Sequence, residues 1–328
     1  MWTEAYWPQS ASSRNNVMKR FLAVLAAILI LCMTAQAEES AGFIQGGRAA
    51  KLADEYFVRV HEGATDALVR IDAEGTPHIS IRADELGDMA AMDGTLYYLM
   101  QTDNAWSLMG LNDGGVFTAY AFADGVKASD IGARAGMLFT LADDKLHIIY
   151  PQQGLCLQLA GARMAEYAVH DDYAYFVSMD NTTKYRLADG DGNVAEYTAG
   201  SLCRVNLSTG ETTTIVPEGA DDLKYADGKL YFHNYADRYL MGAGADMTVE
   251  GRLYSYDIAD GSLTKLTDSY DWDYVTVNGE PFVLRQDGII RLTDGETIAM
   301  IPDSAQMYGA EDAIICFDAE EIEFSILK

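Results

Sequence analysis

The sequence has few of the residues and none of the motifs tested that mark a metalloenzyme or a hydrolase. Its 328 residues include only 5 histidines and 4 cysteines. The histidines share no metal-ligand spacing, and there is no Gly-x-Ser-x-Gly or His-Glu-x-x-His motif. Because no catalytic motif is present, we expect binding or interaction rather than catalysis.

Cysteine is too scarce and too irregular for a disulfide framework. Cys156, Cys203 and Cys316 follow the leader, which makes an odd number, and each lies in a strand-like apolar run. There is no Cys-x-x-Cys pair for a metal. We predict small buried hydrophobes, with a Cys156–Cys203 bridge as the alternative.

Basic residues are also scarce. The chain has 23 lysines and arginines against 50 acidic residues, a formal net charge of -27. Such a field repels nucleic acid and anionic membrane surfaces, and it favours cations and basic partners. The plainer interpretation is a solvated acidic surface.

The first 37 residues have the pattern of an export signal. Met18-Lys19-Arg20 is a basic start, residues 21–33 are apolar, and Ala35-Gln36-Ala37 fits a signal-peptidase site. The apolar run is short for a permanent span. We therefore expect an over-long start at 1–17, a signal peptide at 18–37, and one exported domain at 38–328, extracellular or in the cell envelope. A retained signal anchor is the alternative.

What the sequence does contain is a repeat of bulky apolar pairs, each opening a strand-like run. Successive pairs lie 41, 41, 37, 56, 51 and 32 residues apart, a period typical of a β-propeller. Seven pairs predict seven four-stranded blades, with six as the alternative, and almost no helix. The pairs are Tyr56-Phe57, Tyr97-Tyr98, Leu138-Phe139, Tyr175-Phe176, Tyr231-Phe232, Phe282-Val283 and Ile314-Ile315.

The fifth unit shows the blade most clearly. Residues 222–225 and 229–233 read as strands around the turn Asp227-Gly228, and two further strands follow at 251–256 and 262–266. The last unit lacks a fourth strand. We expect residues 41–45, near the mature N-terminus, to supply it and close the ring.

These residues also resemble a known family. The segments 227–232, 251–257 and 260–267 are similar to the repeat of secreted bacterial β-propellers of unknown function, and that repeat resembles the YWTD propellers of low-density-lipoprotein-receptor relatives and TolB-type propellers. The Tyr-Trp-Thr-Asp tetrapeptide is absent. The resemblance implies binding or scaffolding, and it transfers no functional residue.

Two neighbouring units have long loops between their second and third strands, at about 179–200 and 234–250. In a propeller these loops share one face with the fourth-to-first connections, and long loops on a rigid scaffold concentrate binding residues. Both loops combine Asn, a basic-aromatic pair and Leu, groups that suit a sugar ring or a peptide carboxylate. The alternative is that these residues only fix each loop to its blade. The candidate ligand-binding residues are Asn181, Tyr185, Arg186, His233, Asn234, Tyr235, Arg238 and Tyr239.

One turn invites a calcium hypothesis. Asp189, Asp191 and Asn193 alternate, as carboxylates do in some calcium loops, but Val194 and Gly200 stand where an EF-hand needs Gly and Glu. We expect a polar turn and no cofactor, with calcium as the alternative.

The sequence thus predicts an exported binding module for a glycan, peptide or protein partner, without nucleic acid and without a stable membrane span. Two alternatives stay open: a propeller enzyme that uses carboxylate chemistry on a glycan or peptide, and an envelope assembly scaffold.

Overall fold

Antiparallel strands make up nearly all of the computed structural model. It describes residues 43–328 apart from 63, 243, 269–270, 272, 287, 302–304 and 319–322. Over these residues the only helical element is the short 3-10 helix η1 (Gly244–Asp246), so the all-β prediction is confirmed there. In the same residues no helix is long and apolar enough to cross a membrane. The predicted leader and start lie outside the described residues.

Three sheets are four-stranded meanders whose strands keep the order of the chain. The first holds β2 (Ala49–Leu52), β3 (Glu55–Glu62), β4 (Thr65–Ile71) and β5 (Pro77–Ala83); the second holds β6 (Glu85–Met92), β7 (Thr95–Thr102), β8 (Ala105–Asn112) and β9 (Gly115–Ala121); the third holds β21 (Asp273–Val277), β22 (Glu280–Arg285), β23 (Gly288–Arg291) and β24 (Thr297–Ala299).

Three further sheets vary this plan with five, seven and three strands. The five-stranded sheet adds β1 (Ile44–Gln45) to β10 (Ala128–Arg134), β11 (Met137–Ala142), β12 (Lys145–Tyr150) and β13 (Leu155–Gln158). The seven-stranded sheet holds β14 (Met164–His170), β15 (Tyr173–Ala188), β16 (Val194–Asn206), β17 (Thr212–Ala226), β18 (Lys229–Met241), β19 (Thr248–Asp257) and β20 (Leu263–Lys265). The last holds β25 (Ala305–Gly309), β26 (Ile314–Asp318) and β27 (Glu323–Leu327).

The seven-stranded sheet is two meanders that share one strand. The first part of β17 pairs with β16 as an outer strand, and its last part pairs with β18 as the first strand of the next meander. The predicted fourth and fifth units are therefore one continuous sheet.

The tight turns follow from residues that tolerate positive φ. Asp227 and Gly228 have φ of 47° and 73°, and Asn278 and Gly279 have 49° and 80°. Such Asp-Gly and Asn-Gly pairs make two-residue hairpins, because both central residues must be left-handed. Most first and second strands are thus joined directly.

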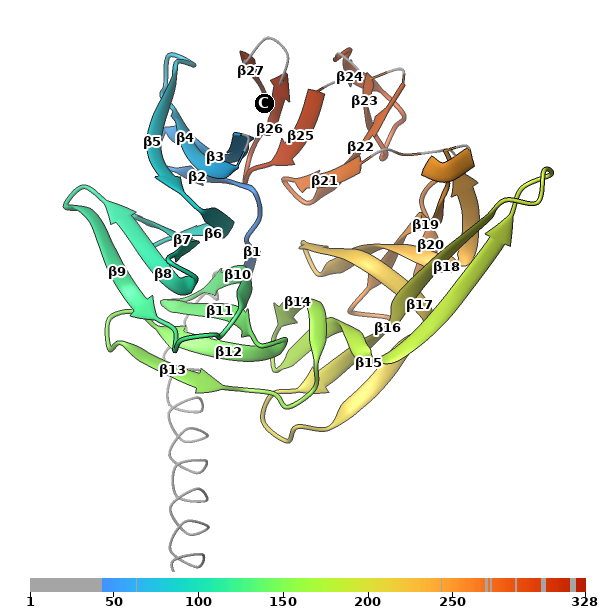
Figure 1. Ribbon diagram of the computed structural model, residues 1–328, viewed down its shortest axis with the longest axis horizontal. Coiled ribbons are helices and arrows are strands. Elements are labelled where there is room, and N and C mark those ends of the chain that lie inside the picture. Colours follow the sequence, from blue (N-terminus) through green and yellow to red (C-terminus); the bar gives the residue numbers. More distant parts are fainter. Residues whose placement is uncertain are drawn as a thin grey trace, which may run out of the picture. The chain divides into compact units, whose positions relative to one another are not determined.

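The first strands of successive meanders pack against one another (Figure 1). β2 contacts β6, β6 contacts β10, and the series continues through β14, β17 and β21 to β25. The core lies between adjacent sheets: Tyr97 and Leu99 of one sheet pack with Ile131 and Leu138 of the next. Successive meanders that pack first strand to first strand are the β-propeller repeat, so this part of the prediction is confirmed.

The predicted role of residues 41–45 is wrong. Residues 41 and 42 lie outside the described residues, but Ile44 and Gln45 pair with Ala133 and Gly132 at the inner edge of β10 and not with the last sheet. The segment lies on β10 because the Phe43 ring packs over Gly132, where the absence of a side chain leaves room for it. In the described residues the last sheet has three strands.

The two long loops are also not loops. Residues 179–200 and 234–250 are largely strand, because β15 with β16 and β18 with β19 continue past a register shift as long hairpins. The bulges follow Val177 and Asn234, and beyond them pairing resumes at Thr182 and Arg238. As predicted, the two hairpins are neighbours: Tyr185 and Ala199 of one share an apolar cluster with Tyr235 and Val249 of the other.

Candidate functional site

The first strands border a cavity of about 1000 Å³, and acidic residues dominate its charged wall. A carboxylate comes from each of five successive first strands, β6, β10, β14, β17 and β21. Arg48 and Lys224 are among the cations in the same wall. The five carboxylates that come from first strands belong to Asp88, Asp130, Glu166, Asp222 and Asp273.

Four of these five first strands carry a β-bulge beside the acidic residue. The register shifts between Leu86 and Met89 in β6, between Ser129 and Ile131 in β10, and at the matching places in β14 and β17. A bulge re-aims a side chain, and bulges are common next to functional sites. Asp130 and Asp222 adopt left-handed φ values of 48° and 50°, a sparsely populated region for residues other than glycine. The backbone thus departs from regular strand geometry where the carboxylates stand.

Two of the carboxyl groups influence each other directly. Burial raises the pKa of Asp130 to about 7, and the charge of Asp88 adds to the rise. Burial likewise raises the pKa of Asp88, against the opposing charges of Arg59 and Arg48. Asp130 is therefore partly protonated at neutral pH.

Glu166 is a third carboxyl with a raised pKa. Burial and then the charge of Asp222 raise it to about 8. Its two oxygens accept hydrogen bonds from the backbone N–H groups of Asp222 at 3.2 Å and Leu223 at 2.5 Å. Burial also raises the pKa of Asp273.

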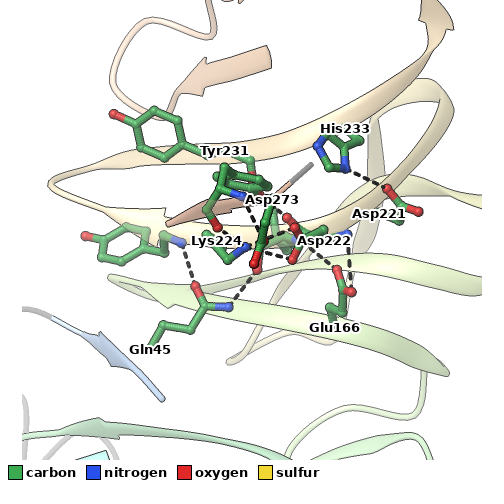
Figure 2. A network of polar contacts seen from close by, with 11 residues as sticks. Gln45, Glu166, Asp221, Asp222, Lys224, Tyr231, His233 and Asp273 are labelled. Carbon is green, nitrogen blue, oxygen red and sulfur yellow. Dashed lines mark hydrogen bonds and ion pairs between the residues drawn. The ribbon is translucent and has the colours of Figure 1, made fainter. Parts of the chain in front are cut away.

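The lysine in this wall is already engaged (Figure 2). Lys224 Nζ donates to both carboxylate oxygens of Asp222 at 2.9 and 3.0 Å and to the carbonyl of Tyr274 at 2.7 Å. It also lies 3.7 Å from the centre of the Tyr274 ring. Lys224 therefore pairs most closely with Asp222, and its charge also opposes the rise in the pKa values of Asp273 and Asp88.

Next to this wall, Asp221 joins the first strands to the long hairpins. Its Oδ2 accepts hydrogen bonds from Tyr197 at 2.5 Å and Tyr235 at 2.8 Å. Its Oδ1 lies 3.5 Å from Nδ1 of His233 (Figure 2). Burial opposes ionisation of Asp221, but the contact with His233 and the hydrogen bonds from the tyrosines lower its pKa. Burial also opposes the charge on His233, yet its contact with Asp221 and the charge of Asp222 raise its pKa.

Several predicted ligand-binding residues are packed inside the hairpins. Tyr235 is fully buried and stacks on Tyr197 at 4.7 Å and Tyr185 at 5.4 Å. The hydroxyl of Tyr185 accepts a hydrogen bond from Gly219 N, and the Arg238 guanidinium lies 5.0 Å from the Tyr185 ring. These contacts fix the hairpins to each other.

The remaining candidates do not converge on one place. Asn234 is buried and accepts a hydrogen bond from Ala236 N, whereas Asn181 and Arg186 are exposed, with Arg186 3.8 Å from Glu196. The Arg252 guanidinium lies 4.0 Å from the centre of the Tyr239 ring. A role for these residues in ligand binding stays a prediction.

The turn at residues 189–193 is held by its own hydrogen bonds. Asp189 Oδ1 accepts from the N–H groups of Asp191 and Asn193, and Asp189 Oδ2 accepts from the Asn193 amide at 2.8 Å. Throughout the described part of the chain, no group of three or more His, Cys, Asp or Glu side chains is arranged to hold a metal. Cys156, Cys203 and Cys316 are free thiols.

Motif searches miss the acidic wall, yet the sequence carries a signal for it. Asp88 precedes Tyr97 by nine residues, and Glu166, Asp222 and Asp273 precede the bulky pairs of their own units by the same interval. Asp130 precedes Leu138 by eight. Superimposing the units on their bulky pairs would have revealed the repeated carboxylate.

Comparisons with known proteins bear on the fold alone. No protein-family model matches the sequence, and no curated protein matches it. Similar solved structures are β-propellers. The designed protein Ika8 has a TM-score of 0.49 at 11% identity, covering 87% of this chain and 98% of its own. TolB from Acinetobacter baumannii has 0.44 at 9%, covering 93% and 68%, and a structure from the nidogen/laminin complex has 0.43 at 9%, covering 87% and 92%.

Proposed function

We propose that this chain is an exported binding module that captures a positively charged ligand, a basic peptide or an amine-bearing glycan, in the cavity between its first strands. One observation carries the proposal: five successive first strands supply a carboxylate to the wall of one cavity. Export is supported by the leader pattern of residues 18–37.

The raised pKa values favour a cationic ligand. Burial raises the pKa of Asp130 to about 7 and that of Glu166 to about 8, so the cations already present do not fully compensate the charge of these carboxyls. A bound ammonium or guanidinium group would supply that compensation, and charge-assisted hydrogen bonds are about twice as strong as neutral ones. An acidic cleft also raises the local concentration of cations and speeds their association.

We infer that the ring has seven blades and closes by packing. β25 contacts β2, as each earlier first strand contacts the next. Side chains of the first and last sheets share an apolar cluster. Asp312 accepts hydrogen bonds from Lys51 at 2.6 Å and Tyr56 at 2.9 Å across the same junction.

The long hairpins fit the same binding face. The bulged acidic positions lie near the start of the first strands, and a second strand ends at that same side of its sheet because neighbouring strands run antiparallel. The tips of β15–β16 and β18–β19 therefore project from the acidic side. Asn181 and Arg186, which are exposed, are the candidate contacts there.

Fluorescence anisotropy of a labelled tetralysine peptide tests this proposal. We expect the double variant Asp130→Asn/Glu166→Gln to bind at least about tenfold more weakly than wild type at pH 8.5, where both carboxyls are mostly ionised. The control, Asp113→Asn/Asp124→Asn, removes two exposed acidic groups that do not line the cavity, and it should bind as wild type does. Equal weakening by both double variants would mean that only the general negative field attracts the peptide.

A propeller enzyme is the second candidate, favoured by the two carboxyl groups that titrate near neutrality in one cavity. Such groups can act as general acid or base at physiological pH. An enzyme would release product from a glycan or peptide library, and either Asp130→Asn or Glu166→Gln alone would abolish the release. Exposed apolar side chains such as Ile79, Phe117 and Met300 lie on separate sheets or connections, so no observation favours the scaffold.

A further inference from the structure

The residues 43–47, called here the inner segment, lie on β10 as an added strand. Ile44 and Gln45 pair with Ala133 and Gly132. Gly46 N donates to the carbonyl of Ile131 at 2.7 Å, and Gly47 exchanges two hydrogen bonds with Met89 of β6. The inner segment is therefore held by main-chain hydrogen bonds to two first strands, as an extended peptide is when it adds to a sheet edge.

The side chain of Gln45 binds the inner segment to β17 as well, which is the first strand of another meander (Figure 2). Its Nε2 donates to the carbonyl of Leu223 at 2.7 Å, and its Oε1 accepts from Tyr225 N at 2.5 Å. The side-chain amide thus satisfies one backbone carbonyl and one backbone N–H of β17, as the backbone of a neighbouring strand would do.

Phe43 occupies a place shaped for an aromatic ring. It is 7% exposed, and its centroid lies about 6 Å from those of Phe139, Tyr167 and Tyr225, at 6.0, 6.1 and 5.9 Å. A Cβ on Gly132 would come within 2.3 Å of the ring. Glycine at 132 is therefore required for this contact, and any larger residue would displace Phe43.

The strand pairing of the inner segment is short. Its pairing with β10 covers two residues, whereas β10 and β11 pair from Ala128 to Arg134. Ile44, between the two anchoring side chains, is 41% exposed and contributes little burial. The same backbone edge and ring pocket would serve any extended peptide with an aromatic residue two positions before an amide.

We propose that the inner edge of β10 is a binding site for an extended peptide and that the inner segment fills it until such a ligand replaces it. This inference rests on the proposed function and narrows its ligand to a peptide, anchored by an aromatic side chain over Gly132 and an amide at β17. The acidic wall beside it, with Asp130 next to Ile131, would favour basic residues elsewhere in that peptide.

The test uses the full-length chain with its inner segment loosened by Phe43→Ala/Gln45→Ala. The probe is a labelled peptide with the sequence of residues 41–47, Ala-Gly-Phe-Ile-Gln-Gly-Gly, followed by anisotropy. A tethered segment acts at about millimolar effective concentration, so loosening it should improve probe binding at least about tenfold over wild type. The matched control probe carries alanine in place of phenylalanine and should not bind.

Three results would overturn the inference: a folded loosened variant that does not bind the probe, binding that is unchanged when Gly132→Val is added, or equal binding by wild type. Binding of tetralysine to the same preparations is scored separately. If tetralysine binds and the probe does not, only the peptide site fails; if tetralysine fails, the proposed function fails.

Hydrogen exchange of the wild-type chain keeps the inference testable if the loosened variant does not fold. The amides of Gly46 and Gly47 should exchange at least about tenfold faster than those of β11, because the inner segment leaves β10 while the sheet stays intact. Exchange of these amides only through global unfolding would contradict a replaceable segment.

Discussion

Replacing Asp130 with asparagine removes one ionisable group from the cavity wall while keeping its shape. Asparagine tolerates the left-handed backbone that Asp130 adopts at φ 48°. It also resembles the protonated aspartic acid in size and polarity. The variant therefore isolates the cost of ionising this carboxyl inside the folded protein.

The size of that cost follows from the pKa. Burial raises the pKa of Asp130 from its usual value of 3.8 to about 7. At about 1.4 kcal/mol for each unit the shift corresponds to roughly 4 kcal/mol, and screening by water in the cavity reduces it, so we expect about 2 to 4 kcal/mol. Because the folded pKa is raised, the unfolded chain loses its proton first, and wild-type stability falls as pH rises from about 4 to about 7.

Urea unfolding at pH 4.5, 6, 7 and 8.5 measures this difference. The free energies of unfolding of wild type and Asp130→Asn should differ by no more than about 1 kcal/mol at pH 4.5, and the variant should be more stable by about 2 to 4 kcal/mol at pH 8.5. Asp113→Asn, the same change in an exposed turn, should follow wild type at every pH. Parallel curves for wild type and Asp130→Asn would refute the assignment of a buried, protonated carboxyl.

Three further predictions concern stability. His233→Gln should lose its stability deficit relative to wild type as pH rises through the raised folded pKa, because the ion pair with Asp221 is present only while His233 is charged; an unchanged difference between pH 5.5 and 8.5 would argue against the pair. Asp312→Asn should cost about 1 kcal/mol in urea unfolding, since it weakens the contact with Lys51 between the first and last sheets, and no loss would count against that junction. Tyr235→Ala should cost about 3 to 5 kcal/mol, because the side chain is fully buried, and a cost below 1 kcal/mol would contradict the packed hairpins.

The propeller repeat was predictable because its signals are local. Bulky pairs such as Tyr231-Phe232 recur at near-regular spacing, and the turns at Asp227-Gly228 and Asn278-Gly279 fall between first and second strands as expected. Each of these signals depends on a few neighbouring residues, so a single sequence is enough to read it.

The place of the N-terminal strand was not predictable in the same way. Its pairing covers Ile44 and Gln45 alone, and its partner Gly132 lies 87 residues away in the chain. What selects β10 is the space above one glycine, which no local pattern marks. The long hairpins were missed for a related reason, since bulges after Val177 and Asn234 interrupt the alternation that identifies a strand.

The candidate site also combines features that a local sequence signal marks with features that depend on tertiary packing. Sequence reasoning selected Tyr185 and Tyr235 for their chemistry, but their burial between two hairpins depends on tertiary packing. The carboxylates at Asp88 and Asp222 were overlooked because acidic residues are abundant, and their shared position becomes visible only when the units are superimposed on the bulky pairs.

Calorimetric titration of the wild-type chain with tetralysine at pH 7.5, in two buffers of different ionisation enthalpy, tests the central claim most directly. A cation that binds in the acidic wall lowers the pKa values of Asp130 and Glu166, so binding should release protons, and the heat should differ between the two buffers. The release should disappear in Asp130→Asn/Glu166→Gln. Binding without proton release, or the same release from that double variant, would contradict a cation site in the cavity.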